Sequence, residues 1–523
     1  MKSIIRFSLA VIVISAMLLA SCGPKPIETP VEEPTKEQDA EPESVTLEFW
    51  SMWNETEPQA EVLKKYAEGF EEETGHTVNI TFNGRENQTL VRTALEAGTQ
   101  IDVMDQDGAP LAGGLMSEGQ GYALDEWLSE PAWGEDQAFS DIFRPGLLEQ
   151  FQLDGKTYLI PHTLITYALW HDKRDLKAAG IDAAPETWKE FLDACEAIKE
   201  TGVEPIAQDA GVNFYNIIWY FYLVERMKGP GYLLAASEDE TGEMWDDPVF
   251  AKAAEMEQEL WDKDYIVEGA EGFSWPQGQQ TMADDISAME LCGSWLPNEL
   301  KDAVAPEFEW GGLPFPAVEG GEGKRTDIPV VMLDFMVLKN SEHPEVAFDF
   351  IRYCMSKDNV QMWADETISG VPRNDVSFPA LIADAEEMFN NATTFFDEVD
   401  GVTFKHAEYA NNVLMPTHDE VFLGQITPEE FAAKMKKLTI EYWKTAGTGE
   451  EEEETEEPEA LNSDATLEFW SMWNETEPQA EVLKKYAEGF EEETGIAVNI
   501  TFNGRENQTL VRTALEAGTQ IDV

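Results

Sequence analysis

Basic residues are scarce in this chain of 523 residues. It carries 35 Lys and Arg against 103 Asp and Glu, which gives a formal net charge of −68 at pH 7. Nucleic acids and anionic lipid surfaces repel a protein of this charge, so we exclude nucleic acid as a partner and simple adsorption to anionic lipid. The 43% of hydrophobic residues, with 16 Trp and 27 Phe, still suffice for a large packed core.

Cysteine and histidine are also rare. The four cysteines are Cys22, Cys195, Cys292 and Cys354, and the six histidines are scattered. No CxxC pair and no metal-ligand spacing occurs, so we expect no metal and no cofactor. The last three cysteines fall in apolar segments, which favours buried free thiols, although one disulfide among them remains open.

Long hydrophobic runs are missing except at the N-terminus. Residues 7–19 form an apolar run that follows Lys2 and Arg6 and is too short to span a bilayer comfortably. It ends in Leu-Ala-Ser before Cys22, which resembles a bacterial lipobox. The resemblance implies that residues 1–21 are a lipoprotein signal peptide and that Cys22 carries acyl chains; an ordinary secretory signal is the alternative. Residues 22–45 are acidic and Pro-rich, which predicts a flexible tether.

One segment occurs twice. Residues 46–103 reappear as residues 466–523, and the copies differ only at His76 against Ile496 and at Thr77 against Ala497. A Glu-rich stretch within residues 446–465 precedes the second copy and is typical of a linker. We interpret the second copy as the front of a truncated second domain or as a redundant stub. In either case it can swap into the place of the first copy, within one chain or between chains.

The first copy has the pattern of an α/β fold. Apolar residues alternate in residues 47–50 and 78–82, and a third strand is expected at 101–104. Helical patterns lie between them, the first from Pro58 to Gly75 and the second closed by Gly98. This β-α-β-α-β order predicts a parallel sheet covered by helices. Ligands bind beyond the carboxyl ends of such strands, which places residues 50–54, 83–86 and 105–108 around one crevice.

A series of motifs resembles family 1 extracellular solute-binding proteins of carbohydrate ABC transporters, the group that includes maltose-binding protein. The motifs run in order through residues 46–445: LEFW at 47–50, FEEETG at 70–75, LEAGTQIDV at 95–103, DGKTYLIP at 154–161, AAGI and PETW at 178–188, AMELCGSW at 288–295, LPFP at 313–316 and AFDFI at 347–351. The family has a Tyr-Asn pair where this chain has Trp170-His171-Asp172, which leaves the hinge contacts open.

The resemblance implies a fold of two lobes. It is the type II periplasmic-binding-protein fold, an α/β architecture with a hinge and a cleft between the lobes. The first lobe is expected at about residues 46–163 and 327–365, and the second at about 164–325 and 366–445. Such lobes close on a ligand by hinge motion.

Ten residues are candidates for ligand contact because sugars need planar polar partners for their hydroxyls and aromatic platforms for their CH faces. The candidates are Trp50, Trp53, Asn83, Arg85 and Asp107 in the first lobe, Tyr167, Asn213, Tyr215 and Trp295 in the second, and Asp334 near the hinge. By resemblance, Trp295 aligns with a tryptophan that stacks on sugar. For each aromatic residue, packing in the core is the alternative.

The resemblance implies the extracytoplasmic substrate-binding component of an ABC importer, a protein that binds a sugar or oligosaccharide and delivers it to the permease. Its partners are the sugar, the permease subunits and, through the lipid on Cys22, the cell membrane. We expect no enzymatic activity, because no nucleophile elbow, zinc motif or phosphate loop occurs. The alternatives are a non-sugar ligand on the same fold and a surface lipoprotein that binds glycans or acts on glycosides.

Overall fold

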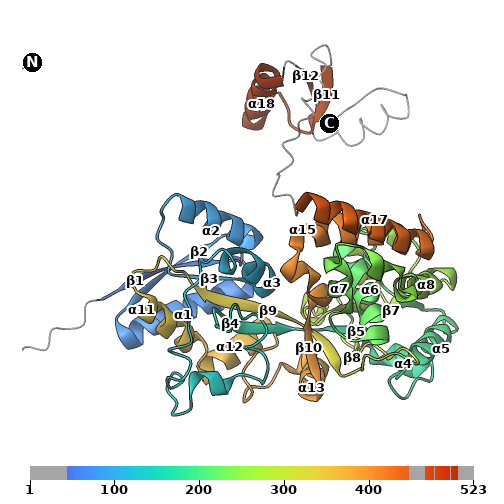
Figure 1. Ribbon diagram of the computed structural model, residues 1–523, viewed down its shortest axis with the longest axis horizontal. Helices are drawn as coiled ribbons and strands as arrows, with labels where there is room; N and C mark the ends of the chain where they lie inside the picture. The colour runs from blue at the N-terminus through green and yellow to red at the C-terminus, as the bar shows by residue number, and fades with distance from the viewer. Residues whose placement is uncertain (1–43, 447–465, 476, 495, 505–523) are drawn as a thin grey trace, which may run out of the picture. The chain divides into compact units, whose positions relative to one another are not determined.

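The computed structural model describes residues 44–446, 466–475, 477–494 and 496–504. Cys22 and the segments expected to be a signal peptide (residues 1–21) and a tether (residues 22–45) lie outside the described residues, apart from residues 44 and 45. Contacts divide the chain into residues 1–44 and residues 45–523, and the second unit holds both lobes (Figure 1).

The helices and strands of the first lobe alternate along the chain. They are β1 (Thr46–Ser51), α1 (Pro58–Thr74), β2 (Thr77–Phe82), η1 (Gly84–Glu86), α2 (Asn87–Glu96), β3 (Val103–Asp107), α3 (Gly108–Leu111), η2 (Ala112–Met116), η3 (Phe139–Ile142), β4 (Leu159–Ile165), β9 (Asp327–Val337), α11 (Pro344–Cys354) and α12 (Lys357–Thr367).

The second lobe and the C-terminal copy contain the other elements. Those of the second lobe are β5 (Tyr167–Asp172), α4 (Lys173–Ala178), α5 (Trp188–Lys199), β6 (Glu204–Ile206), α6 (Asn213–Lys228), α7 (Tyr232–Glu238), η4 (Glu243–Asp246), α8 (Pro248–Asp262), η5 (Ala270–Gly272), α9 (Gln277–Ala283), β7 (Ser287–Gly293), α10 (Leu296–Leu300), β8 (Trp310–Leu313), η6 (Ala380–Ile382), α13 (Ala383–Asn391), β10 (Thr394–Asp397), η7 (Glu398–Gly401), α14 (Val402–Lys405), α15 (Ala407–Tyr409), η8 (Ala410–Leu414), α16 (Met415–Phe422) and α17 (Pro428–Ala446). The copy holds β11 (Thr466–Ser471), α18 (Pro478–Thr494) and β12 (Ala497–Phe502).

The predicted start of the fold is confirmed. Strands β1, β2 and β3 run parallel, and α1 begins with Pro58 and ends at Gly75, whose φ of 77° suits glycine. Strand β3 begins two residues later than expected, at Val103, and continues to Asp107. The six-stranded sheet of the first lobe has the order β10-β9-β3-β1-β2, with β4 paired to β9, and its edge strand β10 comes from the chain of the second lobe.

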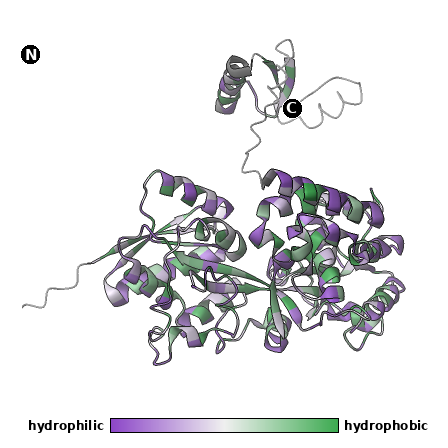
Figure 2. Cartoon of the chain, viewed as in Figure 1, coloured by the Kyte–Doolittle hydropathy of each residue, from purple (hydrophilic) through white to green (hydrophobic). Residues whose placement is uncertain are grey.

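The second lobe is built on a four-stranded sheet in the order β6-β7-β5-β8. Its strands β7 and β5 are buried on both faces, and helix α6 is buried almost throughout. Figure 2 shows hydrophobic residues in the strands and hydrophilic residues on the outer turns of the helices. The long strand β9 links the lobes: it pairs with β10 at its start and with β3 and β4 further along. Together these features form the predicted α/β fold of two lobes.

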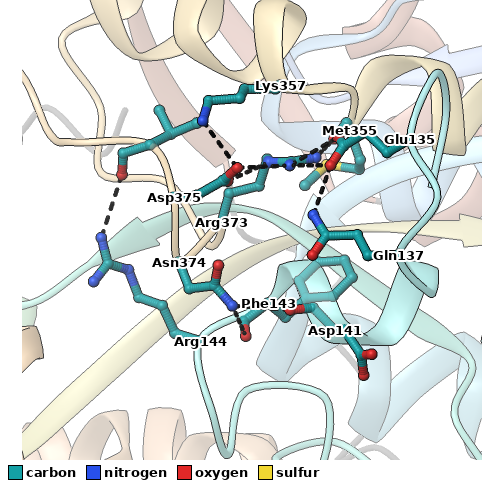
Figure 3. A network of polar contacts seen from close by, with 11 residues as sticks. Glu135, Gln137, Asp141, Phe143, Arg144, Met355, Lys357, Arg373, Asn374 and Asp375 are labelled. Carbon is teal, nitrogen blue, oxygen red and sulfur yellow. Dashed lines mark hydrogen bonds and ion pairs between the residues drawn. The ribbon is translucent and has the colours of Figure 1, made fainter.

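The chain stays with the first lobe for some residues beyond α12. Arg373 is fully buried there and binds Glu135, Asp375 and the carbonyl of Met355 (Figure 3). The backbone N–H of Arg144 also donates to the carbonyl of Pro372. These contacts hold residues 372–375 against the first lobe.

Candidate functional site

A cavity of about 450 Å³ lies between the two lobes. The first lobe lines it with Met52, Trp53 and Arg85, and the second with Tyr215 and Trp295. Strands β4 and β9, which link the lobes, also contribute side chains. Its volume falls in the range of about 300–1,000 Å³ that is usual for small-molecule sites.

Arg85 and Trp53 form the wall contributed by the first lobe. The Arg85 guanidinium lies over the Trp53 ring at 4.8 Å from the centroid, within cation–π range. It donates to the Met52 carbonyl at 2.7 Å and to Glu57 Oε1 at 2.6 Å, so its position is fixed from three sides. Trp53 Nε1 is buried and makes no hydrogen bond within the described part of the chain. This wall therefore offers a ligand the positioned guanidinium of Arg85 and the hydrogen-bond donor Trp53 Nε1.

Asp105 fixes the loop that carries Trp53. Its carboxylate accepts from the backbone N–H of Met52 at 2.7 Å and from Ser51 Oγ at 3.2 Å. Asp105 is fully buried, and burial raises the pKa of its carboxyl to about 7 against these hydrogen bonds. The end of β3 thus sets the position of the loop that follows β1.

Trp295 stands on a tight turn at the end of β7. A side chain at Gly293 would collide with the Trp295 ring, because a Cβ there would lie 2.1 Å from Cζ3. The Trp295 ring stacks on Phe214 at 6.3 Å and meets the Tyr167 ring edge-on at 5.8 Å. Trp295 is therefore held against an aromatic layer while it still lines the cavity.

Acidic groups lie beside this aromatic wall. Glu299 lines the cavity and accepts from Gln279 Nε2 at 3.1 Å and from Trp275 Nε1 at 3.5 Å. Burial raises the pKa of Glu299, and burial together with the charges of Asp209 and Glu299 raises the pKa of Glu290 far above its usual range. The second wall therefore combines aromatic faces with the carboxyl group of Glu299.

A second group of carboxyls, which we call the hinge carboxyl cluster, comprises Asp107, Asp334 and Glu398. Asp334 is buried, and neither of its oxygens has a hydrogen-bond partner among the described residues. Glu398 accepts a hydrogen bond from the hydroxyl of Tyr167. Burial raises the pKa of Asp107 to about 6 and, with the charge of Asp107, raises those of Asp334 and Glu398 well above their usual range. Among the described residues, the three carboxyl groups of the cluster accept hydrogen bonds only from the Tyr167 hydroxyl and the Ala109 backbone N–H.

The structure brings together some of the ten candidate residues. Trp53, Arg85, Tyr215 and Trp295 line the cavity. Asp107, Tyr167 and Asp334 belong to the hinge carboxyl cluster or touch it. The other three lie elsewhere: Trp50 is in β1 and offers its carbonyl to Asn87, Asn83 donates to Asn87 Oδ1 at 2.8 Å, and Asn213 is the first residue of α6.

Several residues at these sites are absent from the sequence-based candidates. They are Glu57, Trp275, Glu299 and Glu398. In the sequence, Trp275 stands out as an aromatic residue beside Pro276 in a polar stretch. In the structure it is 52% exposed. The acidic residues do not stand out in the sequence, since they are three among 103.

The described part of the chain contains three of the four cysteines. Cys195, Cys292 and Cys354 are free and buried there. That part holds no group of His, Cys, Asp and Glu side chains suited to a metal ion. Of the helices described, none has both the length and the apolar character that crossing a bilayer requires.

Two α/β lobes with a cavity between them define a solute-binding fold, and solved structures share it. A chitin oligosaccharide binding protein aligns with a TM-score of 0.62 at 23% identity and covers 76% of this chain and 98% of its own. The solute-binding protein RafE in complex with raffinose gives a TM-score of 0.60 at 17% identity and covers 76% of this chain and 99% of its own.

Sequence comparison identifies the family. Residues 54–361, more than half of the chain, match the family described as "Bacterial extracellular solute-binding protein". The chain therefore belongs to this family of extracellular binding proteins, as its motifs predicted.

Curated relatives include the diacetylchitobiose binding protein NgcE of Streptomyces coelicolor, 22% identical over 316 residues that span 57% of this chain and 65% of the relative. The match thus covers slightly less than two thirds of that relative. The multiple sugar-binding protein of Streptococcus mutans is 21% identical over 371 residues, which span 70% of this chain and 81% of the relative.

Proposed function

We propose that this chain is the substrate-binding component of an ABC importer and that it holds a sugar or oligosaccharide in the cavity between its lobes. The observation that carries the proposal is that Trp53 and Trp295, from different lobes, line one cavity with Arg85 and Glu299. The aromatic rings suit the CH faces of a sugar ring. The guanidinium, the carboxyl group and the free Trp53 Nε1 suit its hydroxyls. The names of the relatives, which include diacetylchitobiose and multiple sugars, support the same ligand class.

Closure of the lobes accounts for the hinge carboxyl cluster. Phe151 of the first lobe and Phe404 of the second pack at 5.1 Å, beside the place where Gly113 meets the Phe404 carbonyl. Separation of the lobes would break this contact and uncover Asp107, Asp334 and Glu398. Their oxygens then become acceptors for ligand hydroxyls, and bound ligand would supply the donors that these groups lack.

Delivery needs a membrane partner. In our proposal Cys22 is the lipidated N-terminus of the mature protein, residues 22–45 form its tether, and the permease subunits receive the ligand at the membrane. Labelling of cells with an alkyne fatty acid tests the anchor: wild-type protein should become labelled and Cys22→Ser should not. Equal labelling of both proteins would refute the anchor and leave the ligand site untouched.

The ligand proposal is tested by thermal shift against a panel of monosaccharides and oligosaccharides, followed by calorimetry on each hit. A sugar at 100 times its Kd should stabilise the protein by about 2.7 kcal/mol, because it binds only the folded state. Trp295→Ala should weaken binding about tenfold or more. Trp310→Ala, which removes a partly buried tryptophan of β8 outside the cavity, should leave the affinity unchanged.

Three results would contradict this function. Equal loss of affinity in the Trp295 and Trp310 variants would show a general effect on folding instead of a contact. Turnover of a chromogenic glycoside would favour an enzyme, and stabilisation by charged metabolites alone would favour a non-sugar ligand.

A further inference from the structure

The C-terminal copy folds like the segment that it repeats. Strand β11 pairs in parallel with β12 from Thr466↔Ala497 to Ser471↔Phe502. Strands β1 and β2 pair in the same register, from Thr46↔Thr77 to Ser51↔Phe82, exactly 420 residues earlier. Helix α18 joins the two strands of the copy as α1 joins β1 and β2. Both copies therefore form the same β-α-β unit.

The two units differ in what covers the helix. Val62 and Tyr66 on α1 are 0% and 3% exposed, whereas the same residues on α18, Val482 and Tyr486, are 43% and 70% exposed. Burial of such side chains stabilises a folded protein because it removes apolar surface from water. The exposed face of α18 therefore has the same side chains as the face that α1 buries against the first lobe.

That surface lies on helices α11 and α12 of the first lobe. The hydroxyl of Tyr66 donates to the carbonyl of Asn359 at 2.6 Å, and its ring stacks on that of Trp363 at 6.3 Å. Phe70 packs against Phe350 at 5.4 Å. The helix residues that make these contacts are repeated without change in α18.

The position of the unit in the sheet favours exchange. In the order β10-β9-β3-β1-β2, strand β2 is at the edge, and β1 pairs with β3 only at Phe49↔Val103 and Trp50↔Met104. Removal of β1, α1 and β2 therefore leaves the pairings among β3, β9 and β4 in place. The incoming copy would restore these contacts except those of His76, which accepts from the Val45 N–H and is Ile496 in the copy, so the exchange changes the free energy little at equilibrium.

We propose that the two copies compete for the α11–α12 surface of the same chain. The 19 residues from 447 to 465 join the copy to the end of α17. A connection of this length keeps the copy at an effective concentration of the order of millimolar, which favours its own chain over another. In the exchanged state Trp473 takes the place of Trp53, so either copy can supply this wall of the cavity.

Zero-length cross-linking tests the proposal in the full chain without any ligand. Lys65 Nζ lies 2.5 Å from Glu366 Oε2, and both side chains are about half exposed. A carbodiimide activates the Glu366 carboxyl, the lysine amine displaces the urea, and an amide forms. In the exchanged state Lys485 replaces Lys65. After trypsin, the linked peptides 65–85 and 485–505 differ in mass through residues 76, 77, 496 and 497.

Exchange predicts both the Lys65–Glu366 and the Lys485–Glu366 cross-links. The reaction is run on an equal mixture of unlabelled and ¹⁵N-labelled protein. Lys485–Glu366 links that join peptides of the same label support exchange within one chain. Links of mixed label would overturn that proposal in favour of a swap between chains, and absence of the Lys485 link would overturn exchange altogether.

Matched variants shift the competition in opposite directions. Tyr66→Ala weakens the first copy and should raise the ratio of Lys485 to Lys65 links about tenfold or more, while Tyr486→Ala should lower it by a similar factor. Should Tyr66→Ala fail to fold, Tyr486→Ala still tests the proposal, because Tyr486 is 70% exposed. An unchanged ratio in Tyr486→Ala would refute the competition.

Discussion

The carboxylate of Asp105 accepts a hydrogen bond of 2.7 Å from the backbone N–H of Met52. Asp105 lies in β3, and Met52 begins the loop after β1, so the bond joins two neighbouring strands of the sheet at the cavity. Trp53 follows Met52 directly, and Arg85 donates to the Met52 carbonyl. One buried side chain thus positions two of the residues that we propose as ligand contacts.

We predict that Asp105→Leu weakens ligand binding about tenfold, because the buried Met52 N–H loses its acceptor and the loop moves. Asp105→Asn keeps an acceptor oxygen at the same place and should bind within about threefold of wild type. Calorimetry with a ligand from the thermal-shift screen measures both. Equal affinities for the Leu variant and the wild type would show that Asp105 does not position the loop.

The stability of the ligand-free protein should fall as pH rises from 6.5 to 8. Desolvation raises the pKa of Asp105 to about 7 and lifts those of Asp334 and Glu290 well above their usual range. In this window the folded state holds protons that the unfolded state has lost, so the free energy of unfolding decreases by up to about 1.4 kcal/mol per pH unit for each group.

The lower limit of the window avoids an opposite effect. Burial lowers the pKa of His162 from 6.5 to about 3, so the unfolded state takes up a proton as pH falls through 6.5, and most of the resulting loss of stability lies below the window. Urea denaturation at pH 6.5, 7.0, 7.5 and 8.0 and constant ionic strength measures the trend. Asp105→Asn should show a shallower slope below pH 7.5, and a stability that rises with pH would contradict the assignment.

Asp334→Asn should stabilise the protein at pH 8. Both oxygens of Asp334 lack hydrogen-bond partners, and the charge of Asp107 opposes its ionisation. An amide removes the ionisable group and offers N–H donors to the neighbouring carboxyls, for a gain of about 1 kcal/mol. Denaturation at pH 5 is the internal control, because the raised pKa of Asp334 opposes its ionisation less at pH 5 than at pH 8 and the gain should shrink. A loss of stability at pH 8 would show that the carboxylate is needed.

The sequence predicted the parts of the site that follow directly from strand order. Trp53 and Arg85 come after β1 and β2, and parallel strands bring their carboxyl ends to one edge of the sheet. Trp295 was reached through its resemblance to a family motif. Glu299 and Trp275 were not predicted, because their place beside the cavity depends on how α9 and α10 pack.

Position in the sequence did not show which candidate side chains meet in the fold and which turn away from the cavity. Asp107 and Asp334 are 227 residues apart in the sequence, yet they meet where β9 returns beside β3. Asn83, in contrast, follows β2 as predicted but turns its amide toward Asn87. Side-chain direction after a strand depends on the local loop, which alternation of apolar residues does not specify.

The last prediction concerns Arg373, which is fully buried and holds the segment after α12 against the first lobe. It forms ion pairs with Glu135 at 2.9 Å and with Asp375 at 2.8 Å, and Lys357 also reaches Asp375 (Figure 3). Hydrogen bonds from Arg373 lower the pKa of Asp375 to about 2. Arg373→Met leaves Glu135 without its cation and Asp375 with Lys357 alone, and should reduce the free energy of unfolding by about 3 kcal/mol.

The matched control is Arg92→Met, which breaks an ion pair of 2.6 Å with Glu118 on the surface, where the two side chains are 40% and 45% exposed. Exposed pairs of this kind contribute about 0–1 kcal/mol, so urea denaturation should separate the two variants clearly. Arg373→Lys should fall between wild type and Arg373→Met, because lysine keeps the charge but loses the fork that reaches both carboxylates. If Arg373→Met and Arg92→Met lose the same stability, then the segment after α12 is held by its backbone contacts and not by the buried arginine.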